Sequence, residues 1–280
     1  MQRFTTIESL RDALAAARKQ DKTIGFVPTM GALHDGHLEL MRRAKRENNL
    51  LVVSIFVNPI QFNNKEDLAK YPRILEADSQ LLETVGCDFL FAPSEQEMYP
   101  EPVNTTYDFG ELVQVMEAAF RPGHFNGVAI VVRKLFEIVE ADTAYFGEKD
   151  FQQLAVIQRL VSMLQLKVKI IPCAIVREPD GLAMSSRNMR LSPTERAIAP
   201  KIYQILQKAV KLRNVLSPTE MKNWTRQQLE MIPEFSIDYV EIADDTHLQP
   251  FQHWNEPKGA ILFVALFLGQ VRLIDNMRIF

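Results

Sequence analysis

The sequence predicts an α/β protein, with a Rossmann-like, doubly wound parallel sheet and a second, smaller α+β domain at its C-terminal end. Over residues 1–178, apolar strand-like runs alternate with amphipathic segments, which is typical of a parallel sheet with helical crossovers. After Arg190 the pattern changes to two helix-start signals followed by three strand-like runs, which fits a small second domain from about residue 180. We therefore expect one domain over residues 1–178 and a smaller one over residues 179–280 that closes over the site.

The first elements are predicted from capping signals and apolar periodicity. Residues 5–8 have the form of a capping box, and Leu10 and Leu14 follow at helical spacing. A short buried strand at residues 24–27 ends at Pro28 and Gly31. The next predicted elements are a helix at 38–46, a strand at 50–57, a helix in the C-terminal part of 67–85 and a strand at 87–92.

The middle of the chain contains its longest connection and its densest turn. Residues 94–107 form a long linking segment, and such loops are often functional. Residues 128–139, after a turn at 121–127, are ambiguous by periodicity, but their length and polar face favour a helix. The remaining predictions are a strand at 143–146, a helix at 154–164 and a strand at 168–176, in which Pro172 suggests a bulge or an edge.

The C-terminal part uses one helix-start signal twice. Ser-Pro-Thr-Glu occurs at residues 192–195 and 217–220, where capping explains it better than a duplicated unit. Pro200 is expected to bend the first of the two helices. Strands are predicted at 235–242, 260–268 and 271–280, with the middle one buried.

The composition is that of an ordinary soluble protein. The chain has 280 residues, 47% of them hydrophobic and 24% charged, and a formal net charge of −3. This balance gives no general attraction to nucleic acid or anionic membranes. No secretory signal is present, and the longest apolar run is too short to cross a bilayer, so we expect a cytoplasmic protein. Cys87 and Cys173 lie in apolar runs and are expected to be buried, reduced thiols.

His34 and His37 lie where the first buried strand gives way to a helix. Three positions apart, their imidazoles share one side of a helical first turn. Backbone N–H groups at a helix start favour anions, usually phosphate. Two alternatives remain open: polar surface histidines, or metal ligands. A zinc site needs three or four ligands, however, and no further ligand has the right spacing.

Two later polar clusters suit a phosphate chain. The dinucleotide fingerprint and the P-loop are both absent, so a bound nucleotide would have to use the histidine turn. Residues 185–188, Ser-Ser-Arg-Asn, offer hydroxyls and a guanidinium, or else form a polar interdomain linker. Residues 147–150, Gly-Glu-Lys-Asp, offer a lysine to a phosphate and a carboxylate to a ribose, or else begin a helix with Asp150 as its cap.

Four further polar residues have both a functional and an ordinary interpretation. Asn58 and Gln61 follow a strand and suit a small polar substrate, although Asn-Pro more often forms only a turn. Asp78 is a candidate for holding Mg²⁺ through water, or is a solvated surface carboxylate. Arg121 would orient an anion, or is merely exposed.

Six motifs, in order and over nearly the whole chain, resemble the pantothenate synthetase family. They are Pro-Thr-Met-Gly-Ala-Leu-His-Asp-Gly-His at 28–37, Phe-Val-Asn-Pro-Ile-Gln-Phe at 56–62, Tyr-Pro-Arg at 71–73, Arg-Pro-Gly-His-Phe-Asn-Gly-Val at 121–128, Tyr-Phe-Gly-Glu-Lys-Asp-Phe-Gln-Gln at 145–153 and Asp-Gly-Leu-Ala-Met-Ser-Ser-Arg-Asn at 180–188. The His-Asp-Gly-His and Met-Ser-Ser-Arg pieces are similar to the paired signatures of the nucleotidylyltransferase and class I aminoacyl-tRNA synthetase superfamily.

The resemblance implies an ATP- and Mg²⁺-dependent ligase, usually homodimeric, that joins pantoate to β-alanine through pantoyl adenylate. The implied ATP site contains Met30, Gly31, Ala32, Leu33, His34, Asp35, Gly36, His37, Gly147, Glu148, Lys149, Asp150, Val176, Met184, Ser185, Ser186 and Arg187. His34 and His37 would lie on the phosphates, with His37 as proton donor, and the segment at 184–187 would close over them with Lys149 balancing charge. Gln61 and Gln153 would hold pantoate. Phe151 stands where the family often has tyrosine.

Two rival functions stand against this one. The first is another adenylyltransferase of the same superfamily, which would leave AMP on a cofactor precursor. The second is a nucleotide-sensing or RNA-binding module, with the C-terminal domain as the reader. The acidic net charge and the lack of a basic, aromatic-studded stripe argue against the second rival.

Overall fold

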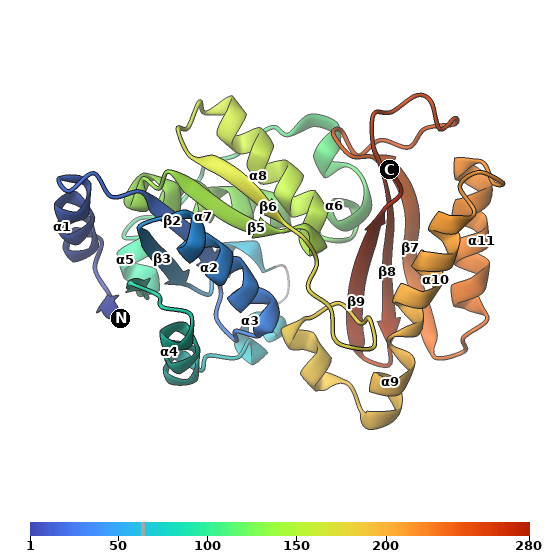
Figure 1. Ribbon diagram of the computed structural model, residues 1–280, viewed down its shortest axis with the longest axis horizontal. Helices are drawn as coiled ribbons and strands as arrows, with labels where there is room; N and C mark the ends of the chain where they lie inside the picture. Colours follow the sequence, from blue (N-terminus) through green and yellow to red (C-terminus); the bar gives the residue numbers. More distant parts are fainter. Residues whose placement is uncertain (63–64) are drawn as a thin grey trace. The chain divides into compact units, whose positions relative to one another are not determined.

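The protein is described from a computed structural model, which describes residues 1–62 and 65–280 (Figure 1). The chain divides into two compact units. The first consists of residues 1–109, 120–148 and 156–174, and the second of residues 110–119, 149–155 and 175–280. The second unit therefore contains two short segments from the middle of the chain in addition to its C-terminal part.

In its described part, the first unit contains a six-stranded, fully parallel sheet. The strands are β1 (Gln2–Phe4), β2 (Ile24–Thr29), β3 (Leu50–Ile55), β4 (Phe89–Phe91), β5 (Thr143–Gly147) and β6 (Lys169–Cys173). Their order, β1-β4-β3-β2-β5-β6, confirms the predicted Rossmann-like class. Pro172 lies on β6 at the edge of the sheet, as predicted, because an edge strand tolerates a missing N–H.

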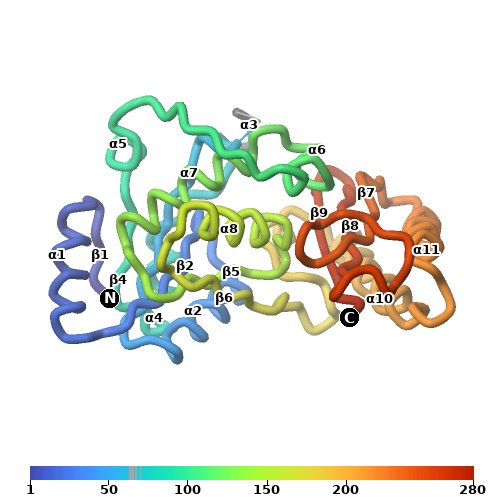
Figure 2. Tube along the Cα trace, turned by 90° about the horizontal axis from the view of Figure 1, so that it is seen from above, coloured from blue at the N-terminus to red at the C-terminus, as the bar shows by residue number. Residues whose placement is uncertain are grey.

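Helices cover both faces of this sheet (Figure 2). Alternate side chains of β2 point to opposite faces: Val27 belongs to a core cluster with Leu38 and Met41 of α2 (Asp35–Glu47), whereas Phe26 packs edge-on against Phe136 of α7 (His124–Val139). α4 (Leu75–Thr84) joins the first face, and α1 (Ile7–Arg18) packs against α7. Shorter elements of this unit are η1 (Pro59–Gln61), α3 (Lys65–Lys70) and α5 (Glu95–Met98).

Several elements of the first unit differ from those predicted, and three of the differences have a clear cause. β2 continues through Pro28, which pairs with Ser54 of β3; pairing with β5 stops at Phe26, so the proline lies beyond the last pairing on that side. α7 begins at His124, four positions before the predicted start, directly after Gly123 in a left-handed conformation. β1 was not predicted, because its three residues are too few to show a period.

The second unit contains an antiparallel sheet of three strands among the described residues: β7 (Phe235–Asp244), β8 (Ala260–Leu268) and β9 (Val271–Arg278). Figure 1 shows α10 (Lys201–Lys211) and α11 (Pro218–Glu230) along this sheet, and both helices contact it. The other elements are η2 (Gly110–Val113), α6 (Met116–Phe120), η3 (Glu148–Asp150), α8 (Phe151–Met163), η4 (Ser186–Arg190) and α9 (Pro193–Ile198), of which α6, η3 and α8 are shared with the first unit.

The two capping boxes predicted in the second unit are present, whereas the one predicted at residues 5–8 is not, because Thr6 caps α1 by accepting from the Ser9 N–H. Ser192 and Ser217 each accept a hydrogen bond from the backbone N–H of a glutamate three residues later, and the glutamate accepts one in return. Pro200 separates α9 from α10, so the predicted bend is a break in the helix. The middle strand, β8, is buried along nearly its whole length, as expected.

The two cysteines are free and buried, which confirms the sequence-based expectation. Burial raises the pKa of the Cys87 thiol to about 12, and burial also raises the pKa of Cys173. Within the part of the chain that is described, no helix is both long and apolar enough to cross a membrane.

Candidate active site

The histidine turn lies at the carboxyl end of β2, where the predicted strand, turn and helix are confirmed. His34 is the N-cap of α2, and its Nδ1 accepts a hydrogen bond from the Gly36 N–H at 3.1 Å. The His37 ring lies beside it, with ring centroids 4.1 Å apart and ring planes at 39°. Both imidazoles are half-buried, so they combine a fixed position with access to solvent. The positive end of the α2 dipole and the two rings together provide a setting suited to an anion.

The backbone before His34 is held in an uncommon conformation. Gly31 and Ala32 have φ angles of +81° and +51°, and left-handed geometry is unfavourable for alanine. The Asp78 carboxylate of α4 stabilises this turn, since Oδ2 accepts from the Ala32 N–H at 2.9 Å and Oδ1 from the Leu33 N–H at 2.8 Å. A Cβ on Gly31 would lie 2.9 Å from Asp78 Oδ2, so glycine also makes room for the carboxylate.

Asp78 is therefore not a solvated surface carboxylate, and that alternative is wrong: the residue is only 1% exposed. Its environment is set by tertiary packing of α4 under the turn, which the helical pattern around it does not reveal. Its suggested role towards Mg²⁺ through water stays a prediction. Among the described residues, no group of three or more His, Cys, Asp or Glu side chains is arranged to hold a metal ion.

Asn58 and Gln61 form a buried polar turn after β3. Asn58 caps η1, donates to the Gly127 carbonyl at 3.0 Å, and accepts from the Tyr99 hydroxyl at 3.0 Å. The predicted Asn-Pro turn is thus present, and Asn58 is fully buried within it. The Gln61 amide lies 3.1 Å from the Met30 sulfur, so the structure brings a predicted substrate ligand against the predicted nucleotide turn.

Supporting residues of this turn were not identified from the sequence. His124 Nδ1 is 2.9 Å from the Gln61 carbonyl oxygen, and His124 is 5% exposed. Gly127 approaches η1 so closely that a Cβ would lie 2.7 Å from the Gln61 Cα. In the sequence, the dense turn at 121–127 was the one feature that could have pointed to these residues. Its partner, the turn at η1, lies more than sixty residues away, so the sequence did not reveal the contact.

An open cavity of about 270 Å³ lies in the first unit, beside the turn that contains Met30 and Gly31. It is bounded by the carboxyl ends of β2, β3 and β4 and by the start of α4, the usual position of ligands in open α/β sheets. Its lining residues are Met30, Gly31, Ile55, Phe56, Val57, Pro72, Arg73, Ile74, Leu75, Asp78, Ala92, Pro93 and Glu95.

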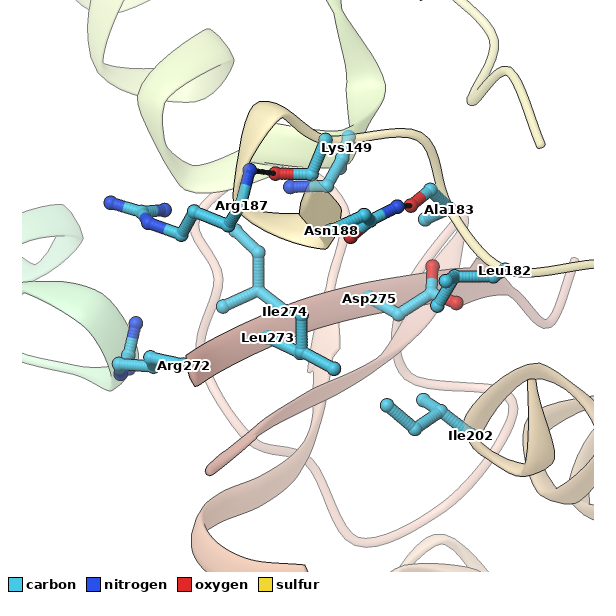
Figure 3. Close-up of a pocket in the computed structure, with 11 residues that line it drawn as sticks. Lys149, Leu182, Ala183, Arg187, Asn188, Ile202, Arg272, Leu273, Ile274 and Asp275 are labelled. Carbon is cyan, nitrogen blue, oxygen red and sulfur yellow. Dashed lines mark hydrogen bonds between the residues drawn. The ribbon is translucent and has the colours of Figure 1, made fainter. Parts of the chain in front are cut away.

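The second unit contains the other predicted phosphate ligands. The Met184 N–H donates to the Val176 carbonyl at 3.0 Å, so these two predicted nucleotide contacts are paired across a hairpin. The Ser185 side chain caps η4 by accepting from the Arg187 N–H at 3.3 Å. Figure 3 shows Lys149, Arg187 and Asn188 above the strand that bears Ile274 and Asp275, around a small pocket.

A partly buried charge network borders this pocket. The Arg272 guanidinium donates to both oxygens of Glu117 at 2.8 and 2.9 Å and to Asp238 at 2.6 Å. Burial works against the charged form of Arg272, but these carboxylates outweigh it and raise its pKa. The Tyr239 hydroxyl donates to Glu117 at 3.0 Å, and burial raises the pKa of this phenol. The network ties the segment at 110–119 to the C-terminal sheet.

The remaining predicted ligands have defined places, and their roles stay predictions. Gly147 ends β5, and Glu148, Lys149 and Asp150 form η3 directly before α8, which contains Gln153. Arg121 is half-buried in the turn before α7, and Ser186 begins η4. Asp35 and Gly36 lie in the first turn of α2.

Comparison with known proteins gives matches over almost the entire chain. A family model described as pantoate-beta-alanine ligase matches residues 2–278. A curated "Pantothenate synthetase" of Porphyromonas gingivalis is 50% identical over 278 residues, covering 99% of each chain. A solved pantothenate synthetase of Thermus thermophilus has 45% identity and a TM-score of 0.93, with full coverage of both chains. A pantoate-beta-alanine ligase of Francisella tularensis, solved with "Beta-gamma ATP and Beta-alanine", has 37% identity and a TM-score of 0.81, covering 100% of this chain and 98% of that one.

Proposed function

The chain belongs to the pantoate-β-alanine ligase family, and on this premise we propose that it condenses (R)-pantoate with β-alanine by way of pantoyl adenylate. A carboxylate oxygen of pantoate attacks the α-phosphorus of ATP, and the bond from that phosphorus to the bridging oxygen breaks to release pyrophosphate. The β-alanine amine then attacks the acyl carbon, loses a proton and displaces AMP. The products are pantothenate, AMP and pyrophosphate.

The observation that carries this mechanism is the pair of imidazoles at the start of α2, with ring centroids 4.1 Å apart. We assign His34 and His37 to the phosphates, with His37 donating a proton as pyrophosphate departs. The half-buried setting supports this role, because donors fixed in advance stabilise developing charge without reorganising. No nucleophilic side chain is needed, since proximity and charge stabilisation supply most of the catalysis.

The other roles follow from motif position and from local geometry. Lys149 and the Ser185–Arg187 segment neutralise the triphosphate, and the remaining nucleotide contacts come from Gly147, Glu148, Asp150, Val176 and Met184. Gln61 binds pantoate and approaches β-alanine, which its contact with Met30 supports. Gln153, Asn58 and Arg121 complete the substrate contacts, with Asn58 acting through the η1 turn that it caps.

Mg²⁺ is proposed as a component of the substrate MgATP. The Asp78 oxygens accept two backbone hydrogen bonds that hold the turn, so we propose that any contact of Asp78 with Mg²⁺ runs through water and not by direct ligation. Mg²⁺ ordinarily binds through substrate phosphates and only one or two protein carboxylates. A homodimer, a cytoplasmic location and closure of the C-terminal domain over the substrates, with domain limits at 178/179, are also proposals, drawn from the family resemblance and the sequence.

Pyrophosphate release tests the first half-reaction directly. With ATP, Mg²⁺ and pantoate but no β-alanine, we expect one equivalent of pyrophosphate per active site and a bound adenylate. Adding β-alanine should convert the adenylate to pantothenate and AMP. No release with pantoate, but release with another acceptor, would favour a different adenylyltransferase. Tight, salt-sensitive RNA binding without ATP turnover would favour a binding module.

A further inference from the structure

Asp275 and Asn276 are two adjacent, buried polar residues on β9. Each is only 5% exposed, although burying a polar side chain is costly unless it is hydrogen-bonded. Successive side chains of a strand point to opposite faces, so together these residues connect β9 to a different segment on each face. Both of those segments contain proposed phosphate ligands.

On one face, Asp275 holds the base of the hairpin formed by residues 176–184. Arg177 donates to its carboxylate through both terminal nitrogens, at 2.7 and 2.9 Å, and a bidentate pair fixes orientation as well as distance. The same guanidinium donates to the Gly181 carbonyl and stacks 3.9 Å from the centre of the Tyr203 ring. Arg177 is therefore held by four partners, counting the Asn276 carbonyl.

This hairpin leads directly into the segment proposed to hold phosphate. Arg177 pairs with Ala183, and the Met184 N–H donates to Val176, so the two arms are in register. The Asn188 amide then donates to the Ala183 carbonyl at 3.0 Å, as Figure 3 shows, which ties η4 back to the hairpin. Asp275 thereby orients the segment containing Ser185 and Arg187 through Arg177 and the hairpin.

On the other face, Asn276 holds η3. Its side-chain Nδ2 donates to the Lys149 carbonyl oxygen at 3.0 Å. This hydrogen bond fixes the backbone of Lys149 and leaves the ammonium group able to reach an anion. An asparagine suits the position because aspartate at the same place would oppose the carbonyl with a second acceptor.

We infer that Asp275 and Asn276 are positioning residues for ATP, since one strand sets the places of both Lys149 and the Ser185–Arg187 segment. The inference rests on the proposed function of those ligands. Preorganised donors give tight binding and fast transfer because the ordering cost is met before the substrate arrives. Loosening either link should weaken ATP binding while leaving pantoate binding intact.

The test uses Asn276→Ala and Asn276→Asp in the full-length enzyme, with three readouts. We expect Kd for a non-hydrolysable ATP analogue, and KM for ATP, to rise on the order of tenfold, the value of one lost hydrogen bond in a preorganised site. KM for pantoate should not change. Amide hydrogen exchange should rise in peptides covering residues 147–153. Asp275→Asn should raise exchange in peptides covering 182–188 instead.

Thr225→Val is the matched control, because Thr225 is also buried in the second unit and donates to the Met221 carbonyl. It should lower the melting temperature without changing ATP parameters. An unchanged KM for ATP in both Asn276 variants would overturn the inference if Lys149→Ala still impairs ATP binding. If Lys149→Ala also has no effect, the proposed role of Lys149 fails, and the inference with it. If Thr225→Val weakened ATP binding as much as the Asn276 variants do, the positioning role would likewise be contradicted.

Discussion

The Asp78 carboxylate accepts two backbone hydrogen bonds, one from Ala32 and one from Leu33, across a sequence separation of more than forty residues. This contact holds Ala32 in its left-handed conformation and sets the direction in which the chain enters α2. The places of both imidazoles therefore depend on a carboxylate that belongs to another helix.

Asp78→Asn tests the importance of this contact. The amide keeps one acceptor but turns a donor towards the second N–H, so we expect a loss of about 1–3 kcal/mol in the free energy of unfolding. KM for ATP should rise, measured by steady-state kinetics, while the Mg²⁺ dependence stays the same. Glu76→Gln is the control, since it removes an exposed carboxylate from the same helix. A shifted Mg²⁺ requirement with unchanged KM for ATP would instead indicate a metal-binding role.

His37→Ala and Lys149→Ala test the proposed charge stabilisation. Each should reduce the rate of adenylation by roughly 10² or more, the usual cost of removing a key electrostatic donor. Burst-phase pyrophosphate release measures this step separately from amide formation. His253→Ala and Lys208→Ala remove an exposed imidazole and an exposed ammonium group and should leave the rate unchanged. Near-normal bursts in the first two variants would refute the assigned roles.

Gly127→Ala tests the close packing of α7 against η1. Helix propensity alone would favour alanine by about 1 kcal/mol. The added Cβ would, however, lie 2.7 Å from the Gln61 Cα and the Ile60 carbonyl, so we expect a net loss of about 1–3 kcal/mol through overpacking. KM for pantoate should rise as the Gln61 turn shifts. Glu137→Ala, an exposed change on the same helix, should leave KM unaltered.

We expect the stability of the protein to depend on pH because the Cys87 thiol is buried. Burial raises its pKa to about 12 from an ordinary value of 9.0, so the folded protein keeps the proton at pH values where the unfolded chain loses it. Its stabilising effect is fully present below about pH 9 and is lost as pH rises towards 12. The free energy of unfolding should fall by up to about 1.4 kcal/mol per pH unit in that window. Urea titrations of Cys87→Ala should show a shallower fall, and equal slopes would contradict the assignment.

Local patterns predicted those parts of the protein whose determinants lie close together in sequence. The buried runs of β2 and β3, the capping boxes at Ser192 and Ser217, and the histidine turn all carry their signal within a few residues. The alternation of strands and helices along the chain then predicted a parallel sheet with helical crossovers.

Features that depend on distant partners were not visible in the sequence. β1 forms only because β4 offers it an edge, and Asp78 resembles an ordinary helical carboxylate until α4 packs beneath the turn. The ion pair between Arg177 and Asp275 joins residues 98 positions apart. No periodicity connects such positions, so their roles required the tertiary structure.

Isotope transfer from pantoate to AMP tests the central claim most directly. Pantoate labelled with ¹⁸O in its carboxylate is turned over with ATP, Mg²⁺ and β-alanine, and the products are analysed by mass spectrometry. If the carboxylate attacks the α-phosphorus, one ¹⁸O atom must appear in AMP. Label in phosphate or pyrophosphate, or unlabelled AMP, would contradict adenylation at this site.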